Sequence, residues 1–403
     1  MARSNGGDDP LTRRDYVKYG GGVLGGTLLA GCTGDTGDGD GSTETTAEES
    51  TPEPAETETE TATPEDTSYT VTMAPVGDVT FEEVPETFTV YESGYADMGI
   101  ALGKGDDLLA VGNKGRFYTD HLAELDGVSV DESKITQLLG DSYAIDSELF
   151  YELDSDVHLI DPQWLLNNGF FKLEQSDLEN VREDVGPFIG NTIFRRTDSW
   201  HTYRYYTMYG AFEKVAQVFQ RHDRYEAVKR IHDETVADVQ AKLPAPDARP
   251  NALLTFAGGT EPEAFYPYRL SGLGTNKKQF HDLGLSDALA GTGIQGLSTN
   301  DRGQIDYETM LQVDPDSILV RGHEGQTRAE FRDTVLAFMK QHDVASELTA
   351  VQEGRVFRGG PIYQGPLQHL FNLERFATLY FPDRFSGELF SRAELSAAVN
   401  GEA

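Results

Sequence analysis

One pattern of apolar and polar positions occurs twice along the chain, once in each half. Residues 145–160 read IDSELFYELDSDVHLI and residues 305–320 read IDYETMLQVDPDSILV, with a constant offset of 160 residues and six identical positions. In each copy, apolar residues at helical spacing precede a polar break and a short apolar run typical of a buried strand. Asp146 and Asp306 are suitable N-caps, and Glu148 and Glu308 fall in the first helical turn. A unit of helix, turn and strand in each half predicts two α/β lobes of related build.

Other short apolar runs, separated by helical patterns, predict a mainly parallel sheet in each lobe. The first lobe is expected to contain a hairpin of 70–73 and 79–81 and strands at 88–91, 107–111 and 157–160. The second is expected to contain strands at 251–256, 318–320 and 356–358. The predicted fold class is therefore α/β, with two Rossmann-like lobes and a ligand cleft between them.

The stretch between the lobes has a helical pattern. Residues 199–243 contain no proline and one glycine, and we expect two helices that break near 221–223. Asp223 with Glu226 resembles a capping box at the start of the second helix. That helix is predicted to be a long rigid connector between the lobes, with a surface helix of one lobe as the alternative.

These features divide the chain into segments. We expect a first lobe at 68–200, a helical connector at 201–245, a second lobe at 246–390 and a loose tail at 391–403. A closing helix is expected at 367–379. Residues 33–67, rich in Thr and Glu, have twelve acidic residues and no basic ones, and they are predicted to form a disordered tether.

The first 32 residues have the features of an export signal. Residues 12–18, TRRDYVK, resemble a twin-arginine signal through Arg13 and Arg14. The apolar run that follows is Gly-rich and too short to span a bilayer, and LAGC at 29–32 matches a lipobox. We therefore expect twin-arginine export and a lipid on Cys32 that anchors the mature protein to the outer face of the cytoplasmic membrane.

The excess of acidic over basic residues argues against nucleic acid as a partner. The formal net charge is −35, and an acidic surface lacks the basic footprint that nucleic acids require. By analogy, such a surface is typical of proteins that stay hydrated in concentrated salt. The single cysteine excludes an internal disulfide.

Candidate ligand contacts follow from the position of the strands, because ligands of open α/β sheets bind at the carboxyl ends of the strands. Aromatic side chains with a polar tip suit a bulky, partly polar guest, and arginine suits carboxylate or catecholate oxygens. Among the residues that this rule selects, we expect nine to contact the ligand: Tyr91, Tyr95, Arg116, Trp164, Tyr266, Arg269, Arg321, His323 and Tyr363. For any one of them, a place in the core or an internal salt bridge is the alternative.

Metal-binding and catalytic motifs were sought by their spacing. The nine histidines form no HxH or HxxxH pair, which predicts no dedicated zinc site and no cofactor. His323 beside Glu324 is the only candidate retained, and ferric iron held directly by tyrosinates and His323 stays open. GxSxG and HExxH motifs are absent from the sequence, so a binding protein is favoured over an enzyme.

The repeated segment is similar to the motif SxExxLxLxPDLVI of the solute-binding proteins of ABC importers for iron(III)-siderophores, haem and cobalamin. Ser155 stands where the first copy of that motif has proline. Further similarities are ALG at 101–103, AVQEGRV at 350–356 and LERFA at 373–377, so that the resemblance covers 70–385. The resemblance implies two lobes joined by a long helix, with ligand between them. It also implies that Glu148 and Glu308 form salt bridges to arginines of a permease that works with its ATPase.

The leading hypothesis is a lipid-anchored protein that delivers an iron(III)-siderophore-type chelate to an ABC permease. Cobalamin or haem in the same role is an alternative ligand. A sensor or adhesion protein without a permease is a competing function, and a secreted metal-dependent enzyme is the least favoured one.

Overall fold

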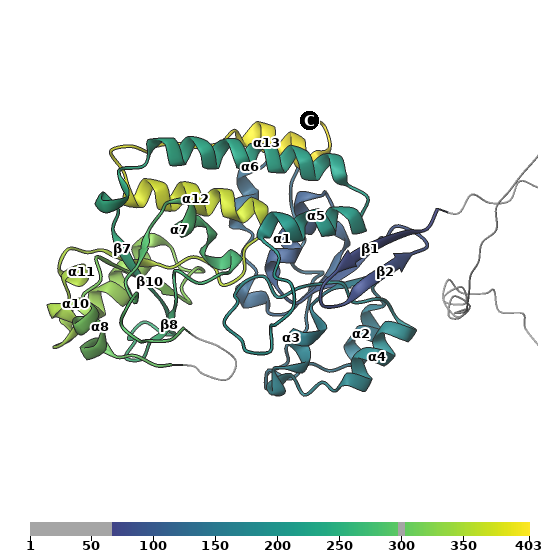
Figure 1. Ribbon diagram of the computed structural model, residues 1–403, viewed down its shortest axis with the longest axis horizontal. Helices are drawn as coiled ribbons and strands as arrows, with labels where there is room; N and C mark the ends of the chain where they lie inside the picture. The colour runs from purple at the N-terminus through teal and green to yellow at the C-terminus, as the bar shows by residue number, and fades with distance from the viewer. Residues whose placement is uncertain (1–66, 297–302) are drawn as a thin grey trace, which may run out of the picture. The chain divides into compact units, whose positions relative to one another are not determined.

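The first lobe is built on a parallel sheet, as the sequence predicts. The structure, a computed structural model, describes residues 67–296 and 303–403. The sheet has the order β5-β4-β3-β6, and all its pairings are parallel. Its strands are β3 (Phe88–Val90), β4 (Leu108–Val111), β5 (Thr136–Gln137) and β6 (Val157–Leu159). The expected hairpin forms a separate sheet of β1 (Tyr69–Met73) and β2 (Gly77–Phe81) (Figure 1).

The second lobe has a mixed sheet around one central strand. β7 (Asn251–Phe256) pairs in parallel with β10 (Ser317–Arg321), which pairs in parallel with β11 (Val356–Arg358). β8 (Tyr266–Tyr268) runs antiparallel to the end of β7, and β9 (Ser286–Asp287) runs parallel to its start. β5, β8 and β9 were not predicted: β5 and β9 have only two residues each, and Pro267 interrupts the pattern of β8.

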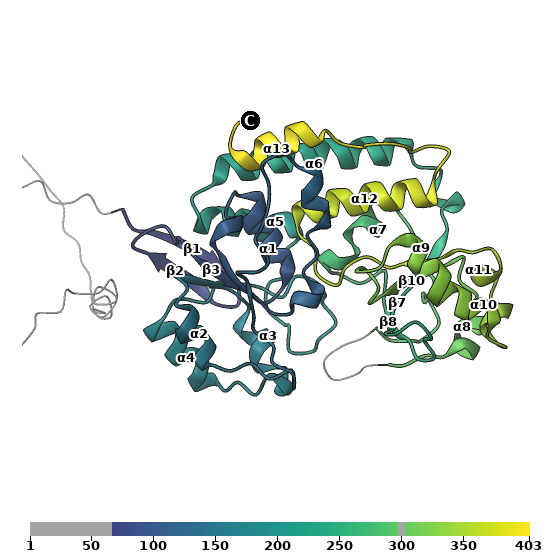
Figure 2. The ribbon, with the colours of Figure 1, turned by 180° about the vertical axis from the view of Figure 1, so that it is seen from behind.

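Helices cover both sheets. In the first lobe they are α1 (Ser93–Ala101), α2 (Glu148–Leu153), α3 (Pro162–Leu166), α4 (Gln175–Asp184) and α5 (Met208–Val218). In the second they are α7 (Lys278–Asp282), α8 (Tyr307–Val313), α9 (Arg328–Phe331), α10 (Ala337–Gln341) and α11 (Thr349–Gln352). The long helices α6 (His222–Lys242) and α12 (Pro366–Tyr380), with α13 (Arg392–Asn400), lie together on one side of both lobes (Figures 1 and 2). No helix within the described residues is long and apolar enough to cross a membrane.

The repeated sequence folds into a repeated structure. α2 leads into β6, and α8 leads into β10, after a turn of the same geometry. The C-cap residues Asp154 and Asp314, which are 160 positions apart, both adopt the left-handed conformation, with φ of 46° and 42°. Asp306 caps α8 as predicted. Asp146 does not cap α2: that helix starts one position later, at a Ser147 N-cap, and Asp146 Oδ1 accepts a hydrogen bond from Glu148 N at 3.1 Å.

The connector α6 contributes to the cores of both lobes. Val228 and Ile231 pack in the first lobe, and Val239 packs in the second. α12 is shared in the same way, with Leu367 in the core of the first lobe and Phe376 in that of the second. Two helices, rather than one, therefore join the lobes.

Two details of this region differ from the prediction. The helix break near 221–223 is present, but Arg221 is the N-cap of α6, so the expected capping box at Asp223 is wrong. Residues 199–207 do not continue a helix, because α5 begins only at Met208, after a Thr207 N-cap.

The tail after Phe390 is not loose. Ser391 caps α13, its Oγ accepting from Glu394 N at 3.2 Å, and Gly401 ends the helix in the left-handed conformation. Leu395 and Val399 are buried in the same core as α6. Terminal position alone suggested disorder, whereas the Ser-x-x-Glu signal and the apolar spacing specify a packed helix.

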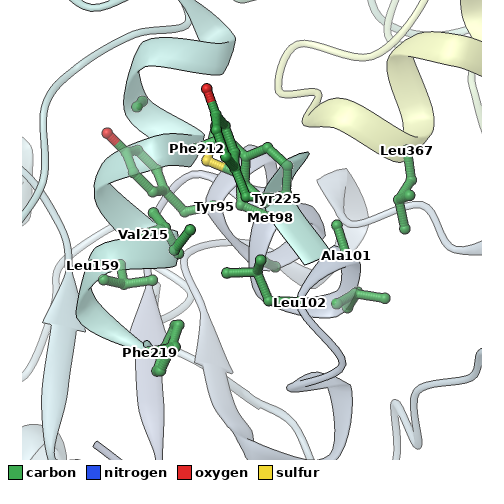
Figure 3. Packing of buried hydrophobic residues seen from close by; sticks show 14 of the residues in the cluster. Tyr95, Met98, Ala101, Leu102, Leu159, Phe212, Val215, Phe219, Tyr225 and Leu367 are labelled. Carbon is green, nitrogen blue, oxygen red and sulfur yellow. The ribbon is translucent and has the colours of Figure 1, made fainter. Parts of the chain in front are cut away.

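The core of the first lobe lies between its sheet and helices α1, α5 and α6. Figure 3 shows Tyr95 and Met98 of α1 packed near Phe212 and Val215 of α5. Tyr95 thus belongs to this core.

Candidate functional site

A cavity of about 500 Å³ lies between the two lobes. Its lining from the first lobe consists of Tyr91, Asn113, Arg116, Leu139, Tyr143, Trp164, Asn168, Phe170, Phe194 and Arg195. Its lining from the second lobe consists of Phe256, Tyr266, Tyr268, Ile362 and Tyr363. Most of these positions follow strands of the two sheets, so the cavity forms where the carboxyl ends of both sheets meet.

Five of the nine predicted contacts line this cavity: Tyr91, Arg116, Trp164, Tyr266 and Tyr363. Tyr91 directly follows β3, and Arg116 lies in the turn after β4. Trp164 is on α3, which follows β6, and its backbone is positioned by a Pro162 start and an Asp161 N-cap. The structure therefore brings together residues that are up to 272 positions apart in the sequence.

Tyr95 and Arg269 do not line the cavity. The Tyr95 hydroxyl donates to Asn191 O at 2.8 Å inside the core, because Tyr95 is already part of α1 rather than of the loop before it. Arg269 Nε donates to Asp287 Oδ2 at 3.0 Å, and its Nη1 donates to Ile294 O at 3.0 Å. The alternative of an internal salt bridge therefore holds for Arg269.

Arg321 and His323 also lie outside the cavity. Arg321 is completely buried, with its guanidinium carbon 4.7 Å from the ring centroid of Tyr268, which itself faces the cavity. His323 is buried against Phe331, with 5.4 Å between ring centroids. Its neighbour Glu324 forms an ion pair with Arg375 at 2.6 Å, so these residues join a loop to α12.

The cavity wall is a continuous set of aromatic rings. The Trp164 ring lies 5.7 Å from that of Tyr91 and 5.2 Å from that of Phe194. The Tyr363 ring is 4.9 Å from Phe194 and 6.3 Å from Tyr91. These tilted and edge-to-face contacts hold the rings in place before any ligand arrives.

Two aromatic side chains of the lining are exposed instead of buried. Tyr143 is 59% exposed and Phe170 is 41% exposed, which is unusual for side chains of this size. Exposed aromatic residues beside a cavity provide apolar surface that a bulky ligand can cover.

The cavity contains one arginine without a carboxylate partner. Arg195 is neutralised, since its Nε and Nη2 donate to the two oxygens of Asp198 at 2.9 and 3.1 Å. Arg116 forms no ion pair with a carboxylate of the described residues, and its nearest ionisable neighbours are the phenols of Tyr363, Tyr91 and Tyr268. Arg116 is therefore the positive charge that an incoming anion would meet.

Two tyrosines of the wall, Tyr91 and Tyr363, remain neutral. Burial raises the pKa of Tyr91 well above its ordinary value, and burial also raises the pKa of Tyr363. Their hydroxyls therefore keep their protons at neutral pH and offer hydrogen-bond donors to oxygen-rich ligands. The same burial disfavours the tyrosinate form of Tyr91 and Tyr363, which direct ligation of ferric iron would require. His323 does not line the cavity with these tyrosines.

Ten lining residues were missed by the strand-end rule. Phe194 and Arg195 come from 190–207, which contains no helix or strand, so no element end marked them. Tyr268 belongs to β8, whose antiparallel pairing with β7 turns it toward the cavity. The one available signal was the alternation of Tyr266 and Tyr268 in FYPYR, which is typical of a strand with one face on a site.

Glu148 and Glu308 are both exposed, each in the first turn of its helix. Helices α2 and α8 lie on the side of the molecule away from α6, one on each lobe (Figures 1 and 2). Two equivalent exposed glutamates therefore belong to helices on the same side of the molecule.

Comparison with known proteins identifies the family. The model of the family described as periplasmic binding protein matches residues 89–363, more than half of the chain. Comparison with curated proteins gives no match.

Solved structures have the same fold. The petrobactin-binding protein YclQ of Bacillus subtilis is 16% identical, over 82% of this chain and 98% of its own, with a TM-score of 0.53. A protein of the ABC-type Fe3+-hydroxamate transport system of Saccharomonospora viridis is 20% identical, over 78% and 98%, with a TM-score of 0.51. The iron-uptake substrate-binding protein PiuA of Streptococcus pneumoniae is 15% identical, over 76% and 96%, with a TM-score of 0.51. Together with the family match, the two lobes and the cavity between them establish that this chain belongs to the periplasmic binding protein family.

Proposed function

We propose that the protein captures an iron(III)-siderophore-type chelate in the cavity between its lobes and delivers it to an ABC permease. The observation that carries this proposal is the cavity itself, with its wall of preformed aromatic rings and Arg116, the lining arginine without a carboxylate partner among the described residues. A volume of about 500 Å³ lies within the range of sites for small organic ligands. The names of the fold relatives, which include petrobactin binding and Fe3+-hydroxamate transport, agree with this ligand class.

The lining suits a chelate, whose metal is already fully coordinated, better than a compound whose metal must be coordinated by a protein side chain. The described lining contains no histidine, cysteine or methionine, and burial keeps Tyr91 and Tyr363 in the neutral form. Haem and cobalamin, whose metals accept such axial ligands, are therefore the second candidates.

Tryptophan fluorescence tests the ligand class directly, because one of the two tryptophans of the chain lines the cavity and the other lies next to it. Trp164 lines the cavity, and the Trp200 ring lies 6.3 Å from it. Titration with a ferric hydroxamate or a ferric catecholate should quench the emission saturably. If ferric siderophores, haem and cobalamin all leave the emission unchanged, this ligand class is wrong.

Arg116→Met is expected to weaken binding of an anionic chelate about 10- to 100-fold, because it removes a charge-assisted hydrogen bond worth about 1.5–3 kcal/mol. Binding of an uncharged hydroxamate chelate should change much less. Fluorescence titration of both ligands measures the two affinities.

Lys114→Met is the matched control, because it removes a positive charge two positions away that does not line the cavity. Lys114 Nζ donates instead to the carbonyls of Glu132 and Ile135, at 2.7 and 3.0 Å. Equal losses for both variants would mean that only general charge, and not a contact by Arg116, is involved.

Attachment to the outer face of the cytoplasmic membrane is part of the same proposal. Arg13, Arg14 and Cys32, together with the tether up to residue 66, lie outside the described residues. Their support is the order of twin-arginine signal, short apolar run and lipobox in the sequence.

Cys32→Ala is expected to abolish incorporation of a labelled lipid precursor into the protein, because a lipobox lipid is attached through its cysteine thiol. Labelling of cells that produce either form measures this, with immunoblots to confirm equal amounts of protein. Lipid label on the Cys32→Ala form would place the anchor elsewhere. The folded lobes are expected to be unaffected, since residue 32 precedes them.

A further inference from the structure

Three side chains that could bind a metal meet where the two lobes are joined. His232 is on the connector α6, Asp282 is the last residue of α7, and His369 is on α12. One potential ligand atom from each lies within 4.8 Å of the others, and no second group of this kind occurs in 67–296 and 303–403. His232 is 6% exposed and His369 is completely buried.

The hydrogen bonds leave a free ring nitrogen on each histidine. His232 Nδ1 is 2.8 Å from Asp233 Oδ1, and His369 Nε2 is 2.8 Å from Asp282 Oδ2. Since an ionised carboxylate only accepts, each of these ring nitrogens carries the proton. His232 Nε2 and His369 Nδ1 are then bare lone pairs, and neither has a hydrogen-bond partner among the described residues. Buried acceptors without a donor are unfavourable. Because His369 faces Asp282 with Nε2, it would ligate an ion shared with Asp282 through that nitrogen, with the ring proton moved to Nδ1.

The charges around the two histidines are negative on balance, which favours a divalent cation. The carboxylates of Asp97, Asp233 and Asp282 act on the two histidines, against the one ammonium of Lys278, which pairs with Asp282 at 2.9 Å. His121 Nε2 forms a hydrogen bond with Asp97 Oδ1 at 3.2 Å. The negative charge near the rings thus exceeds the positive charge.

We propose that His232, Asp282 and His369 form a structural Zn²⁺ site that joins the connector α6 to α7 and α12. Two imidazole nitrogens and one carboxylate oxygen are a ligand set that Zn²⁺ commonly takes, with one position left over. The Tyr209 hydroxyl, which is also buried without a hydrogen-bond partner, belongs to a ring 4.1 Å from that of His232.

Binding requires a small contraction of the cluster. Zinc bonds of about 2.0–2.2 Å place tetrahedral ligand atoms about 3.3–3.5 Å apart, compared with the present limit of 4.8 Å. Because α6 and α12 each pack into both lobes, a metal at this point would hold the lobes together at their junction.

Cobalt(II) tests the site, because its visible spectrum separates a compact protein site from a hydrated surface ion. The full chain, treated with a chelator and dialysed, should bind one equivalent of Co²⁺ with intense absorption bands, and Zn²⁺ should displace it. Zn²⁺ at 100 times its Kd should raise Tm by about 5 °C. A wild-type protein without such bands and without a Tm shift overturns the proposal, whether or not any variant folds.

Three variants assign the ligands. His232→Gln and His369→Gln should each lose the cobalt bands and the Tm shift. His222→Gln should keep both, because it is an exposed histidine of the same helix α6 that pairs with Glu226. Retention of the bands in both buried variants, or their loss in His222→Gln, would place the metal elsewhere and refute the assignment.

Discussion

Replacing both Glu148 and Glu308 by alanine is expected to abolish uptake of the ferric chelate while leaving its affinity for the protein unchanged. Both carboxylates are exposed, and neither lines the cavity. They lie 160 positions apart at the start of equivalent helices, one on each lobe. A permease with two-fold symmetry and a basic pocket on each half would contact them both at once.

The size of the effect follows from the cost of leaving a partner charge unpaired. Loss of one member of a buried, hydrogen-bonded charge pair in an interface costs about 2–5 kcal/mol, so the double variant should weaken docking at least about 10³-fold. By contrast, a glutamate in a first helical turn stabilises its own helix by only about 0.3–1 kcal/mol. The folded protein should therefore survive the substitutions that prevent transport.

Uptake of radiolabelled ferric chelate by cells carrying each variant measures the prediction, with fluorescence titration of the purified protein for affinity. Glu226→Ala with Glu234→Ala is the control, since it removes two exposed glutamates from α6, on the opposite side of the molecule (Figure 1). Full transport by the double variant at 148 and 308 would contradict the docking role. Equal loss of transport in the control would mean that net charge, and not position, matters.

The repeat made the architecture predictable. Two copies of a helix–turn–strand unit lead to two lobes, and the structure extends the equivalence to the left-handed Asp154 and Asp314. Neither the shared role of α12 nor the packed α13 was anticipated, because which helix packs on which lobe depends on contacts distant in sequence.

The site was predictable where a side chain directly follows a parallel strand, as Tyr91 does. The rule failed where the chain had already entered a helix, as at Tyr95. It also failed where the last residue of a strand is buried against another side chain, as Arg321 is against Tyr268. It also failed for Arg195, which is placed by an irregular segment. Strand ends locate the edge of a sheet, whereas the direction of each side chain depends on packing.

The histidine cluster lies beyond any rule of local spacing. His232, Asp282 and His369 come from three helices separated by 50 and 87 residues, so no short motif connects them. We predicted no dedicated metal site because such motifs are absent from the sequence. The structure brings the three residues together in space, which spacing along the chain could not indicate.

A buried lysine close to the charges of Arg321 and Arg195 leads to the second large effect, on stability. Lys277 is 1% exposed, and its burial, together with the charge of the nearby Arg321, lowers its pKa from 10.5 to about 7. Asp287 acts in the opposite direction, and Arg195 adds to the lowering. The folded protein therefore releases this proton at a much lower pH than the unfolded chain does.

The free energy of unfolding, measured relative to that of Lys277→Met, is expected to rise between pH 7 and pH 10.5. In that range the unfolded chain holds a proton on Lys277 that the folded protein lacks, so raising the pH favours the folded state. A shift from 10.5 to about 7 corresponds to at most about 5 kcal/mol over the whole range. Below pH 7 both states are protonated, and the difference should be constant.

Denaturant unfolding of the wild type and of Lys277→Met at several pH values measures this difference, in which the titration of all other groups cancels. Lys340→Met, at an exposed position, controls for the general effect of replacing a lysine by methionine. A difference that stays flat from pH 7 to pH 10.5 would mean that Lys277 is solvated in the folded protein. A rising difference would show that Lys277 is neutral in the folded protein above pH 7, so that Arg116 and not Lys277 supplies the positive charge that an anionic ligand meets there.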